Sequence, residues 1–414
     1  MSLTAHSAET AKQLPMQIAN NSSVFPISFW CGPPDKFISA ERFQEIKEAG
    51  FTHVMPPCGG AANVERNRKI LDFSQQAGLK AFIADARMTT ALTGVPDAKA
   101  RLDALINDYK MHPALAGYSI TDEPGAGAFP GLAEVVAYLK ENDAPHPAYI
   151  NLFPNYASAG QLGVATYEQY LREFVGKVKP SVLSYDHYHF LHNGDRPLFF
   201  ANLAAARKVS QEFQLPFWQI VLAVQHGPYR NLTEGELRYE AMQTLAYGGK
   251  GLMWFTYWQP DDPSFQWSHA MINLDGSRDA HYDMIKQINQ EVAAFGQQLL
   301  NADSTLVFHS GQVPPGGTQP PNNTPVLTAG KGDFTIGIFD NSSKSAPKTL
   351  ALITNADYRN PVTTEVMIKT GHSKLQRFNP MTRQWQMVTG AGKPDGEIMI
   401  PLHLAPGGAA LAGW

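Results

Sequence analysis

The stretch Gly117-Tyr118-Ser119-Ile120-Thr121-Asp122-Glu123-Pro124 reads as a short apolar strand that ends in two acidic residues and is stopped by a proline. In a barrel of parallel strands, the carboxyl end of a strand is where catalytic side chains are placed. Burial among aromatic neighbours raises the pKa of a carboxyl group toward neutral pH, so that the group can act as a general acid. Asp122 and Glu123 are therefore candidates for acid–base chemistry. The alternative interpretation is a polar turn after the strand, with Asp122 capping the loop.

The rest of the chain supplies the barrel, because short apolar runs alternate with amphipathic helices from Phe25 to about Gln298. The predicted strands are Phe25–Trp30, Phe51–Met55, Leu79–Ala84, Leu115–Thr121, Ala148–Leu152, Val182–Tyr185, Phe217–Val224 and Gly251–Tyr257. The predicted helices are Ser39–Ala49, Asn63–Ala77, Asp97–Tyr109, Leu132–Glu141, Tyr167–Val178, Leu198–Phe213, Thr233–Tyr247 and Tyr282–Phe295. Eight strands alternating with eight helices predict a (β/α)₈ TIM barrel of the α/β class. An open doubly wound sheet would also alternate, but no glycine-rich phosphate-binding sequence follows the first strand.

The C-terminal part has a different pattern. Residues 311–325 (GQVPPGGTQPPNNTP) predict a loop. Short strand-like runs then recur about every ten residues, which is typical of a small antiparallel β-sandwich. These runs are Phe334–Phe339, Thr349–Thr354, Val362–Ile368, Leu375–Phe378, Met387–Val388 and Ile398–Pro401. We therefore expect a barrel over residues 22–300 and a C-terminal β-sandwich domain over residues 301–414.

Composition narrows the class of partner. The formal net charge is −4 and no run of Lys or Arg occurs, which argues against a nucleic acid or an acidic membrane surface as partner. No stretch reaches the roughly 20 apolar residues that a membrane span needs. Aromatic residues make up 11% of the chain, which suits a protein that stacks on the apolar faces of sugars.

Two features bear on the compartment of the protein. Cys31 and Cys58 are predicted to be two buried thiols, with a single disulfide as the alternative. The N-terminal segment Met1–Asn21 shows no signal peptide. The start Met1-Ser2-Leu3 is also compatible with a secreted or periplasmic protein whose signal peptide has been replaced, so the compartment stays open.

Polar side chains follow the predicted strands and should meet at the rim of the barrel. They are Asp85 with Arg87, Asp122 with Glu123, Asn151, Asp186 with His187, Gln225 with His226, and Tyr257 with Trp258. Sugar hydroxyl groups need hydrogen-bond donors and acceptors around the ring, and the apolar face of a sugar needs an aromatic platform. The set therefore predicts a carbohydrate site. Asp85 with Arg87 could equally be a structural ion pair, Trp30 is expected in the core, and Trp267 lies in a loop that could cover the site.

This residue set resembles the retaining (β/α)₈ glycoside hydrolases of the β-galactosidase and cellulase clan, and the resemblance covers most of the chain. In that clan the fourth strand ends in Asn-Glu-Pro, and its acid/base glutamate falls on Glu123 here. The asparagine that binds the sugar 2-hydroxyl falls on Asp122. The stretch from Leu245 to Trp258 looks like the eighth-strand region of that clan, where the tryptophan lines the sugar subsite.

One position departs from the clan, because Gln225 stands where the nucleophilic glutamate after strand seven is expected. Three explanations compete: an engineered substitution that traps a ligand, another carboxylate in its place, or a barrel that binds sugar without hydrolysing it. We favour another carboxylate, with Asp186 first and Asp85 second. An inverting hydrolase needs only a base about 6.5–9.5 Å from the acid, which another strand can supply.

The sequence thus predicts a glycoside hydrolase that acts on an oligosaccharide or polysaccharide, without a cofactor or a metal. Glu123 would protonate the leaving oxygen, and Asp186 would be the second carboxylate. The predicted sugar contacts are Asp85, Asp122, Asn151, His187, Gln225, His226, Tyr257 and Trp258. The alternatives are a non-catalytic carbohydrate-binding barrel and a metal-dependent barrel hydrolase built on Asp186, His187 and His226.

Overall fold

The computed structural model describes residues 24–328, 332–342, 347–371, 374–388 and 396–414. The N-terminal segment Met1–Asn21 and the expected start of the barrel at residue 22 lie outside these residues. Within them, eight parallel strands form one sheet in the order β1-β10-β9-β6-β5-β4-β3-β2. They are β1 (Ile27–Phe29), β2 (His53–Val54), β3 (Lys80–Ile83), β4 (Leu115–Asp122), β5 (Ala148–Leu152), β6 (Leu183–Asp186), β9 (Phe217–Leu222) and β10 (Leu252–Phe255).

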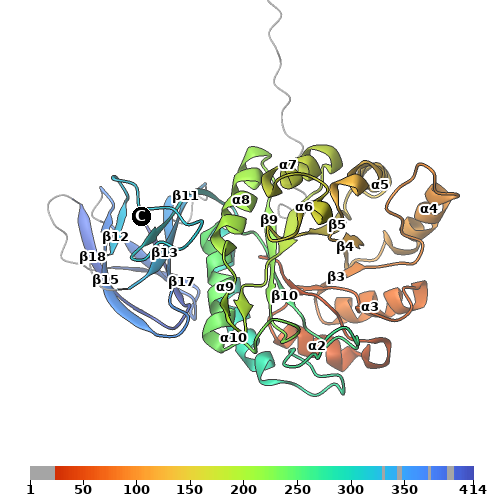
Figure 1. Cartoon of the computed structure of the whole chain (residues 1–414). Helices are drawn as coiled ribbons and strands as arrows, with labels where there is room; N and C mark the ends of the chain where they lie inside the picture. The colour runs from red at the N-terminus through yellow and green to blue at the C-terminus, as the bar shows by residue number, and fades with distance from the viewer. Residues whose placement is uncertain (1–23, 329–331, 343–346, 372–373, 389–395) are drawn as a thin grey trace, which may run out of the picture.

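The sheet closes into a barrel, because the backbone N–H of Thr52, just before β2, donates to the carbonyl of Ile27 in β1 at 2.9 Å. Helices follow the strands and form the outer ring (Figure 1). They are α2 (Ala40–Glu48), α3 (Val64–Gln76), α4 (Ala98–Tyr109), α5 (Phe129–Asn142), α7 (Tyr167–Val178), α8 (Phe199–Glu212), α9 (Glu234–Ala246) and α10 (Ala280–Leu299), with a one-turn helix α6 (Ala159–Leu162) before α7. The predicted (β/α)₈ barrel is confirmed. No helix among the described residues is long and apolar enough to cross a membrane.

Local sequence signals begin several of these helices. The side chain of Ser39 accepts from the backbone N–H of Arg42 at the start of α2. Before α9, Thr233 and Glu236 form a capping box, in which each side chain accepts from the backbone N–H of the other residue. These contacts satisfy N–H groups that the first turn of a helix leaves without partners.

The interior of the barrel is filled by large side chains. Phe82 on β3 contacts Trp218 on β9, with ring centroids 6.3 Å apart, although these strands are not neighbours in the sheet. The contact therefore crosses the barrel. The buried members of this interior cluster are Met55, Phe82, Tyr149, Val182, Trp218, Ile220 and Met253. The interior is a packed core, so a ligand can bind only at the open ends.

A β-sandwich follows the barrel, as predicted. Its described strands form a six-stranded antiparallel sheet and a three-stranded one. The first contains β11 (Ala302–Ser310), β13 (Phe334–Asn341), β14 (Thr349–Asn355), β16 (Gln376–Asn379), β17 (Gln384–Met387) and β19 (Ala409–Gly413). The second contains β12 (Val326–Thr328), β15 (Val362–Lys369) and β18 (Glu397–Leu404). The sequence did not predict β11, β12 or β19. Residues 311–325 contain no helix or strand, in agreement with the predicted loop.

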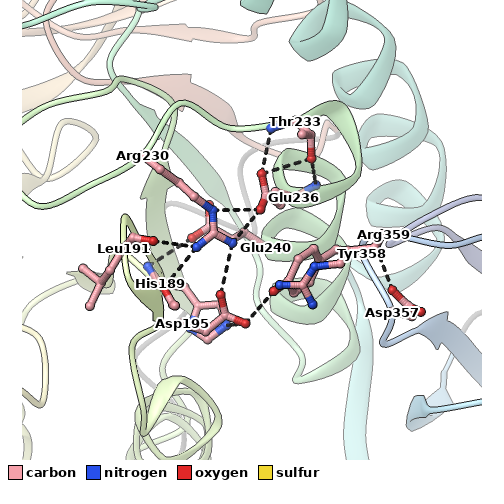
Figure 2. A network of polar contacts seen from close by, with 11 residues as sticks. His189, Leu191, Asp195, Arg230, Thr233, Glu236, Glu240, Asp357, Tyr358 and Arg359 are labelled. Carbon is pink, nitrogen blue, oxygen red and sulfur yellow. Dashed lines mark hydrogen bonds and ion pairs between the residues drawn. The ribbon is translucent and has the colours of Figure 1, made fainter.

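The six-stranded sheet packs on the outer face of the barrel, beside α8, α9 and α10 (Figure 1). Tyr247, which follows α9, contacts His309 of β11 through its hydroxyl group at 2.9 Å. Gln243 of α9 donates to the hydroxyl oxygen of Thr354 in β14 at 3.1 Å. Figure 2 shows a third contact, in which the hydroxyl group of Tyr358 donates to Asp195 at 2.6 Å. Asp195 belongs to a small hairpin after β6, formed by β7 (Phe190–Leu191) and β8 (Gly194–Asp195).

The prediction of two free thiols was wrong, because Cys31 and Cys58 form a disulfide with their Cα atoms 4.7 Å apart. Both cysteines lie just after neighbouring strands, β1 and β2, so closure of the barrel brings them together. The disulfide ties two rim loops on the same side as the candidate site. Disulfides persist mainly in oxidising compartments.

Candidate active site

Three carboxyl groups and one amide meet at the carboxyl ends of three adjacent strands. Asp122 and Glu123 come at the end of β4, Asn151 lies in β5, and Asp186 ends β6. The order β4-β5-β6 in the sheet places Asn151 between the acidic residues of its two neighbours. In the register of the sheet, Asn151 is the direct partner of Asp122. The structure therefore brings together four of the predicted site residues, which we call the carboxyl cluster.

Asn151 holds the cluster in place. Its side-chain N–H₂ group donates to Oδ1 of Asp122 at 3.0 Å and to Oδ1 of Asp186 at 2.9 Å. Its carbonyl oxygen accepts from the hydroxyl group of Ser184 at 3.4 Å. Asn151 is buried, with 3% of its surface exposed, so water does not replace these contacts. Both N–H groups of the amide are used, which fixes the direction of one oxygen on each carboxyl group.

Glu123 is intermediate in exposure between Asp122, which is exposed, and Asp186, which is buried. Its side chain is half-buried and forms a hydrogen bond with the carboxyl group of Asp186. Asp186 itself is 4% exposed. The backbone of Glu123 has φ = +45°, a conformation that bulky residues rarely adopt, while its N–H donates to the carbonyl of Asn151 at 2.9 Å. Residues held in such conformations often occur at functional sites.

The cluster raises the pKa of each of its acids. Burial, followed by the negative charge of Asp122, raises the pKa of Glu123 to about 7. Burial and the charges of Glu123 and Asp122 raise the pKa of Asp186 well above its usual range. Burial also raises the pKa of Asp122, although its side chain is exposed to water. Near neutral pH the Glu123–Asp186 pair therefore retains a proton.

Aromatic side chains border the cluster, and the sequence did not identify most of them. Tyr188 stacks on Phe255 with ring centroids 5.0 Å apart, and both pack against the interior core from above. The pKa of Tyr188 is raised by burial and then by the charges of Asp186 and Asp122, among others, which places its hydroxyl group near the carboxyl cluster. Trp30 was expected in the core, but it is half-buried and packs on the same interior cluster. Trp30, Tyr188 and Phe255 are therefore partly buried aromatic residues that pack on the interior core.

Gln225 and His226 lie in the loop after β9, three and four residues beyond the end of the strand. The backbone of Gln225 pairs with Ser268, and its side-chain oxygen accepts from the hydroxyl group of Ser268 at 3.2 Å. His226 stacks on Trp267 with ring centroids 4.6 Å apart, and burial lowers its pKa to about 4. Both residues thus contact the loop that follows β10, and the described residues show no hydrogen bond from either to the carboxyl cluster.

Tyr257 and Trp258 lie away from the cluster. Strand β10 ends at Phe255, so both residues fall in the following loop. Tyr257 is fully buried and stacks on Phe29 at 4.6 Å. Trp258 is 2% exposed, and the guanidinium group of Arg42 lies 5.0 Å from its ring centroid. Phe255, not Trp258, therefore presents an aromatic ring at the end of the eighth barrel strand.

The side chains of Asp85 and His187 form hydrogen bonds with residues outside the carboxyl cluster. The carboxylate of Asp85 accepts from the guanidinium group of Arg87 at 2.9 Å and from the hydroxyl group of Tyr109 at 2.6 Å. Arg87 and Tyr109 together hold the pKa of Asp85 below its usual value, against the effect of burial. His187 is fully buried, contacts Asn202 of α8 at 3.0 Å and has its pKa lowered to about 3 by burial.

The described residues contain no group of three or more His, Cys, Asp or Glu side chains that could hold a metal ion. In particular, His187 faces α8 whereas His226 faces the loop after β10. The two histidines of the metal-dependent alternative therefore have different surroundings.

Comparisons with known proteins support the fold. No protein-family model matches the chain, and no curated protein matches its sequence. A catalytic mutant of a GH42 β-galactosidase from G. stearothermophilus matches with a TM-score of 0.62 and 8% identity, over 95% of this chain and 98% of that chain. A β-galactosidase from Bacillus circulans sp. alkalophilus matches with a TM-score of 0.56 and 10% identity, over 96% and 100%. A GH27 β-L-arabinopyranosidase from Geobacillus stearothermophilus matches with a TM-score of 0.51 and 11% identity, over 96% of this chain and 98% of that chain.

The β-galactosidase of the psychrophilic Marinomonas ef1 matches with a TM-score of 0.51 and 12% identity, over 67% of this chain, which spans 62% of the length of that protein. At such low identities these matches establish the fold alone. The barrel with its C-terminal β-sandwich, and its structural similarity to (β/α)₈ glycoside hydrolases, are confirmed.

Proposed function

We propose that this protein is a glycoside hydrolase that cleaves a glycosidic bond of an oligosaccharide or polysaccharide at the carboxyl cluster. The observation that carries the proposal is the hydrogen bond between the carboxyl groups of Glu123 and Asp186 at the carboxyl ends of β4 and β6. Glycoside hydrolysis generally uses two carboxyl groups with different protonation states. Paired acids in a poorly solvated site cannot both ionise near neutral pH, so they supply this difference.

Glu123 is the general acid in this mechanism. A pKa of about 7 leaves a substantial fraction of Glu123 protonated at neutral pH, when an ordinary glutamate would be ionised. Its half-buried position lets a sugar oxygen approach, whereas Asp186 lies deeper in the barrel. Proton transfer from Glu123 to the glycosidic oxygen would make that oxygen a better leaving group. General acid catalysis of this kind contributes about 10²–10⁴ in rate.

Asp186 is the second carboxylate. Glu123 and Asp186 are close enough in the free protein for each carboxyl group to shift the pKa of the other, whereas the carboxyl groups of retaining enzymes are about 5–5.5 Å apart and those of inverting enzymes about 6.5–9.5 Å. A bound sugar must therefore separate Glu123 from Asp186. In the free protein the contact between the two groups raises the pKa of Asp186 and lowers that of Glu123, so its loss on sugar binding shifts the shared proton toward Glu123. The resulting carboxylate of Asp186 can then stabilise the positive charge that develops on the sugar or activate a water molecule, while Asn151 keeps its orientation through the contact at 2.9 Å.

A second candidate function is sugar binding without hydrolysis. The side chain of Gln225 favours it, because this uncharged residue stands near the position where a nucleophilic glutamate would be expected and contacts Ser268. In this case the carboxyl cluster would accept hydrogen bonds from sugar hydroxyl groups and would not transfer a proton.

Hydrolysis of a panel of neutral and acidic aryl glycosides and polysaccharides, measured for the wild type and for Glu123→Gln, tests the proposal. We expect Glu123→Gln to lose about 10²–10⁴ in kcat on a substrate with a poor leaving group, because it loses only the proton donor. Glu65→Gln, at an exposed site on α3, is the matched control and should keep full activity. Equal turnover by wild type and Glu123→Gln on that substrate would contradict the assignment. Binding of sugar with no turnover in any assay would favour the second candidate.

A further inference from the structure

Arg196, just after the β7–β8 hairpin, contacts the side chains of Tyr156 and Tyr229 and the backbone carbonyl of Tyr188. Its Nε donates to the backbone carbonyl of Tyr188 at 3.1 Å, and its Nη2 donates to the hydroxyl group of Tyr229 at 3.0 Å. The guanidinium carbon is 3.8 Å from the ring centroid of Tyr156, which is a close cation–π contact. The side chain is therefore fixed in position and only half-buried.

The guanidinium group has unused donors. Arg196 forms no ion pair with any residue that the structure describes, and its Nη1 atom has no hydrogen bond with them. Nη1 is also not among the buried polar atoms that lack a partner, so it is accessible to solvent. A fixed guanidinium group with a free, accessible edge is prepared to bind an anion, since its donors match a carboxylate or a sulfate in geometry.

The acidic side chains near Arg196 already form ion pairs with the neighbouring Arg230. It donates to Glu236 at 2.6 and 3.0 Å and to Asp195 at 3.1 Å, and Asp195 also accepts from Tyr358 (Figure 2). The positive charge of Arg230 is thus balanced by Glu236 and Asp195. Arg196 receives only neutral acceptors, a carbonyl and a hydroxyl group, so its positive charge is left without a counter-ion.

The free arginine borders the proposed catalytic groups. The hydroxyl group of Tyr156 interacts with Tyr229, and its pKa is raised by burial and then by the charge of Asp186. The backbone carbonyl of Tyr188 accepts from Arg196, and its ring stacks on Phe255. Burial raises the pKa of Tyr188, and the charges of Asp186, Asp122 and Glu123 contribute to this rise. The ring of Tyr156, which contacts Arg196, also lies 5.1 Å from the ring of His187, the residue that follows Asp186. Recognition by Arg196 requires that a substituent of a sugar held at the cluster, or the next sugar of its chain, extends to the guanidinium group.

We propose that the saccharide bound at this site carries an anionic group, either the carboxylate of a uronic acid or a sulfate ester, which Arg196 recognises. This inference rests on the proposed function and specifies its substrate class. The acids of the carboxyl cluster create a negative potential that repels an anionic sugar, so an anionic substrate needs a compensating cation at the rim. A neutral sugar offers hydroxyl groups only, and these do not require a full positive charge. The partial burial of Arg196 strengthens its attraction for an anion, because water screens a half-buried charge less than an exposed one.

Binding of matched sugar pairs by the full chain tests the proposal independently of turnover. The pairs are galactose with galacturonate, glucose with glucuronate, and galactose with galactose 6-sulfate, titrated calorimetrically and as inhibitors of any hydrolysis found. We expect the wild type to bind the acidic member of at least one pair ten times more tightly or better, and this ratio should fall as salt rises. Arg196→Gln should reduce the ratio at least tenfold. Arg196→Lys should keep part of it, because it retains the charge but loses the planar donors.

Arg383→Gln is the control, since Arg383 is an exposed arginine in the β16–β17 turn of the C-terminal domain, and it should leave the ratio unchanged. A preference for the uronate pairs or for the sulfate pair identifies which anion is bound, and either supports the proposal. Equal binding of acidic and neutral sugars by the wild type would overturn it. An equal loss of affinity for acidic and neutral sugars in Arg196→Gln would also overturn it, because that result would mean that Arg196 has a structural role. Acid-selective binding that depends on Arg196 without any hydrolysis would overturn the proposed function and keep this inference.

Discussion

The carboxyl groups of Glu123 and Asp186 form a hydrogen bond with each other although their strands, β4 and β6, are not neighbours in the sheet. The intervening strand β5 contributes Asn151, whose amide contacts Asp186 on one side and Asp122 on the other. The result is a pair of acids whose pKa values are both raised, and a third acid, Asp122, that is exposed beside it.

The first prediction concerns the alkaline limb of the pH profile. Because Glu123 must be protonated to act, kcat/KM should fall tenfold per pH unit above the pKa of about 7. The negative charge of Asp122 contributes to that raised pKa, so Asp122→Asn should move the limb toward lower pH. Initial rates between pH 4 and 10 on one aryl glycoside would check both. A limb that stays in place in Asp122→Asn would mean that another group controls it.

The second prediction concerns Asp186. Asp186→Asn keeps an acceptor for the amide of Asn151 but removes the charge, so the fold and the binding of sugar should change little. Turnover should fall by far more than binding, because a carboxylate that stabilises the transition state contributes little to the ground state. Steady-state kinetics together with calorimetric titration of a product sugar separates the two. A variant with normal kcat and weaker binding would make Asp186 a substrate contact.

The sequence was sufficient to place the carboxyl cluster, for physical reasons that are local. An apolar run stopped by Pro124 locates the end of a strand, and a polar residue at that end must lie at the rim if the strand is in a barrel. The same logic placed Asn151 and Asp186. It did not place Tyr257 and Trp258 in the cluster, because β10 ends at Phe255 and both residues lie buried in the loop that follows.

The remaining features depend on how distant segments meet, which a single sequence does not specify. Cys31 and Cys58 are 27 residues apart, and only closure of the barrel between β1 and β2 brings them into contact. Arg196 follows a hairpin inserted after β6, and its role depends on three tyrosines from separate loops. Strand β19 is rich in Ala and Gly and has little intrinsic preference for a strand, so its pairing with β14 and β16 must come from tertiary packing.

The third prediction concerns the disulfide. A crosslink that closes a loop of 27 residues should stabilise the fold by about 3–4 kcal/mol, mainly by restricting the unfolded chain. The Cys31→Ala, Cys58→Ala double variant should therefore unfold at lower urea concentration than the oxidised wild type, and reductant should lower the midpoint of the wild type alone. Thiol titration confirms the redox state. An unchanged midpoint after complete reduction would contradict the prediction.

The fourth prediction concerns Glu240, which lies in α9 and is fully buried (Figure 2). It accepts from the backbone N–H of His189 at 3.3 Å, its Oε2 has no hydrogen-bond partner among the described residues, and burial raises its pKa well above the usual value of 4.5. The folded protein therefore keeps this proton when the unfolded chain releases it. As pH rises above about 4.5, Glu240 should lower the free energy of unfolding by up to about 1.4 kcal/mol per pH unit, until pH reaches its pKa in the folded state.

Glu240→Gln removes this contribution while preserving the shape of the side chain. Urea unfolding at a series of pH values should show a shallower loss of stability toward alkaline pH for Glu240→Gln than for the wild type. Glu365→Gln, at an exposed position on β15, is the control and should follow the wild type. Parallel curves for wild type and Glu240→Gln would mean that Glu240 is ionised in the folded protein.

The last prediction concerns Gln225, the position at which a nucleophilic glutamate was expected. Its side-chain oxygen contacts the hydroxyl group of Ser268, and its backbone is paired with the same residue, three residues beyond the end of β9. A glutamate at this position could keep the contact with Ser268, so Gln225→Glu should fold normally. We expect its rate, pH profile and product stereochemistry to match those of the wild type, because the side chain is directed at the loop after β10. Methanolysis followed by NMR of the anomeric proton measures the stereochemistry. A large gain in rate with retention of configuration would show instead that residue 225 faces the reacting sugar and that the wild-type protein is a disabled retaining enzyme.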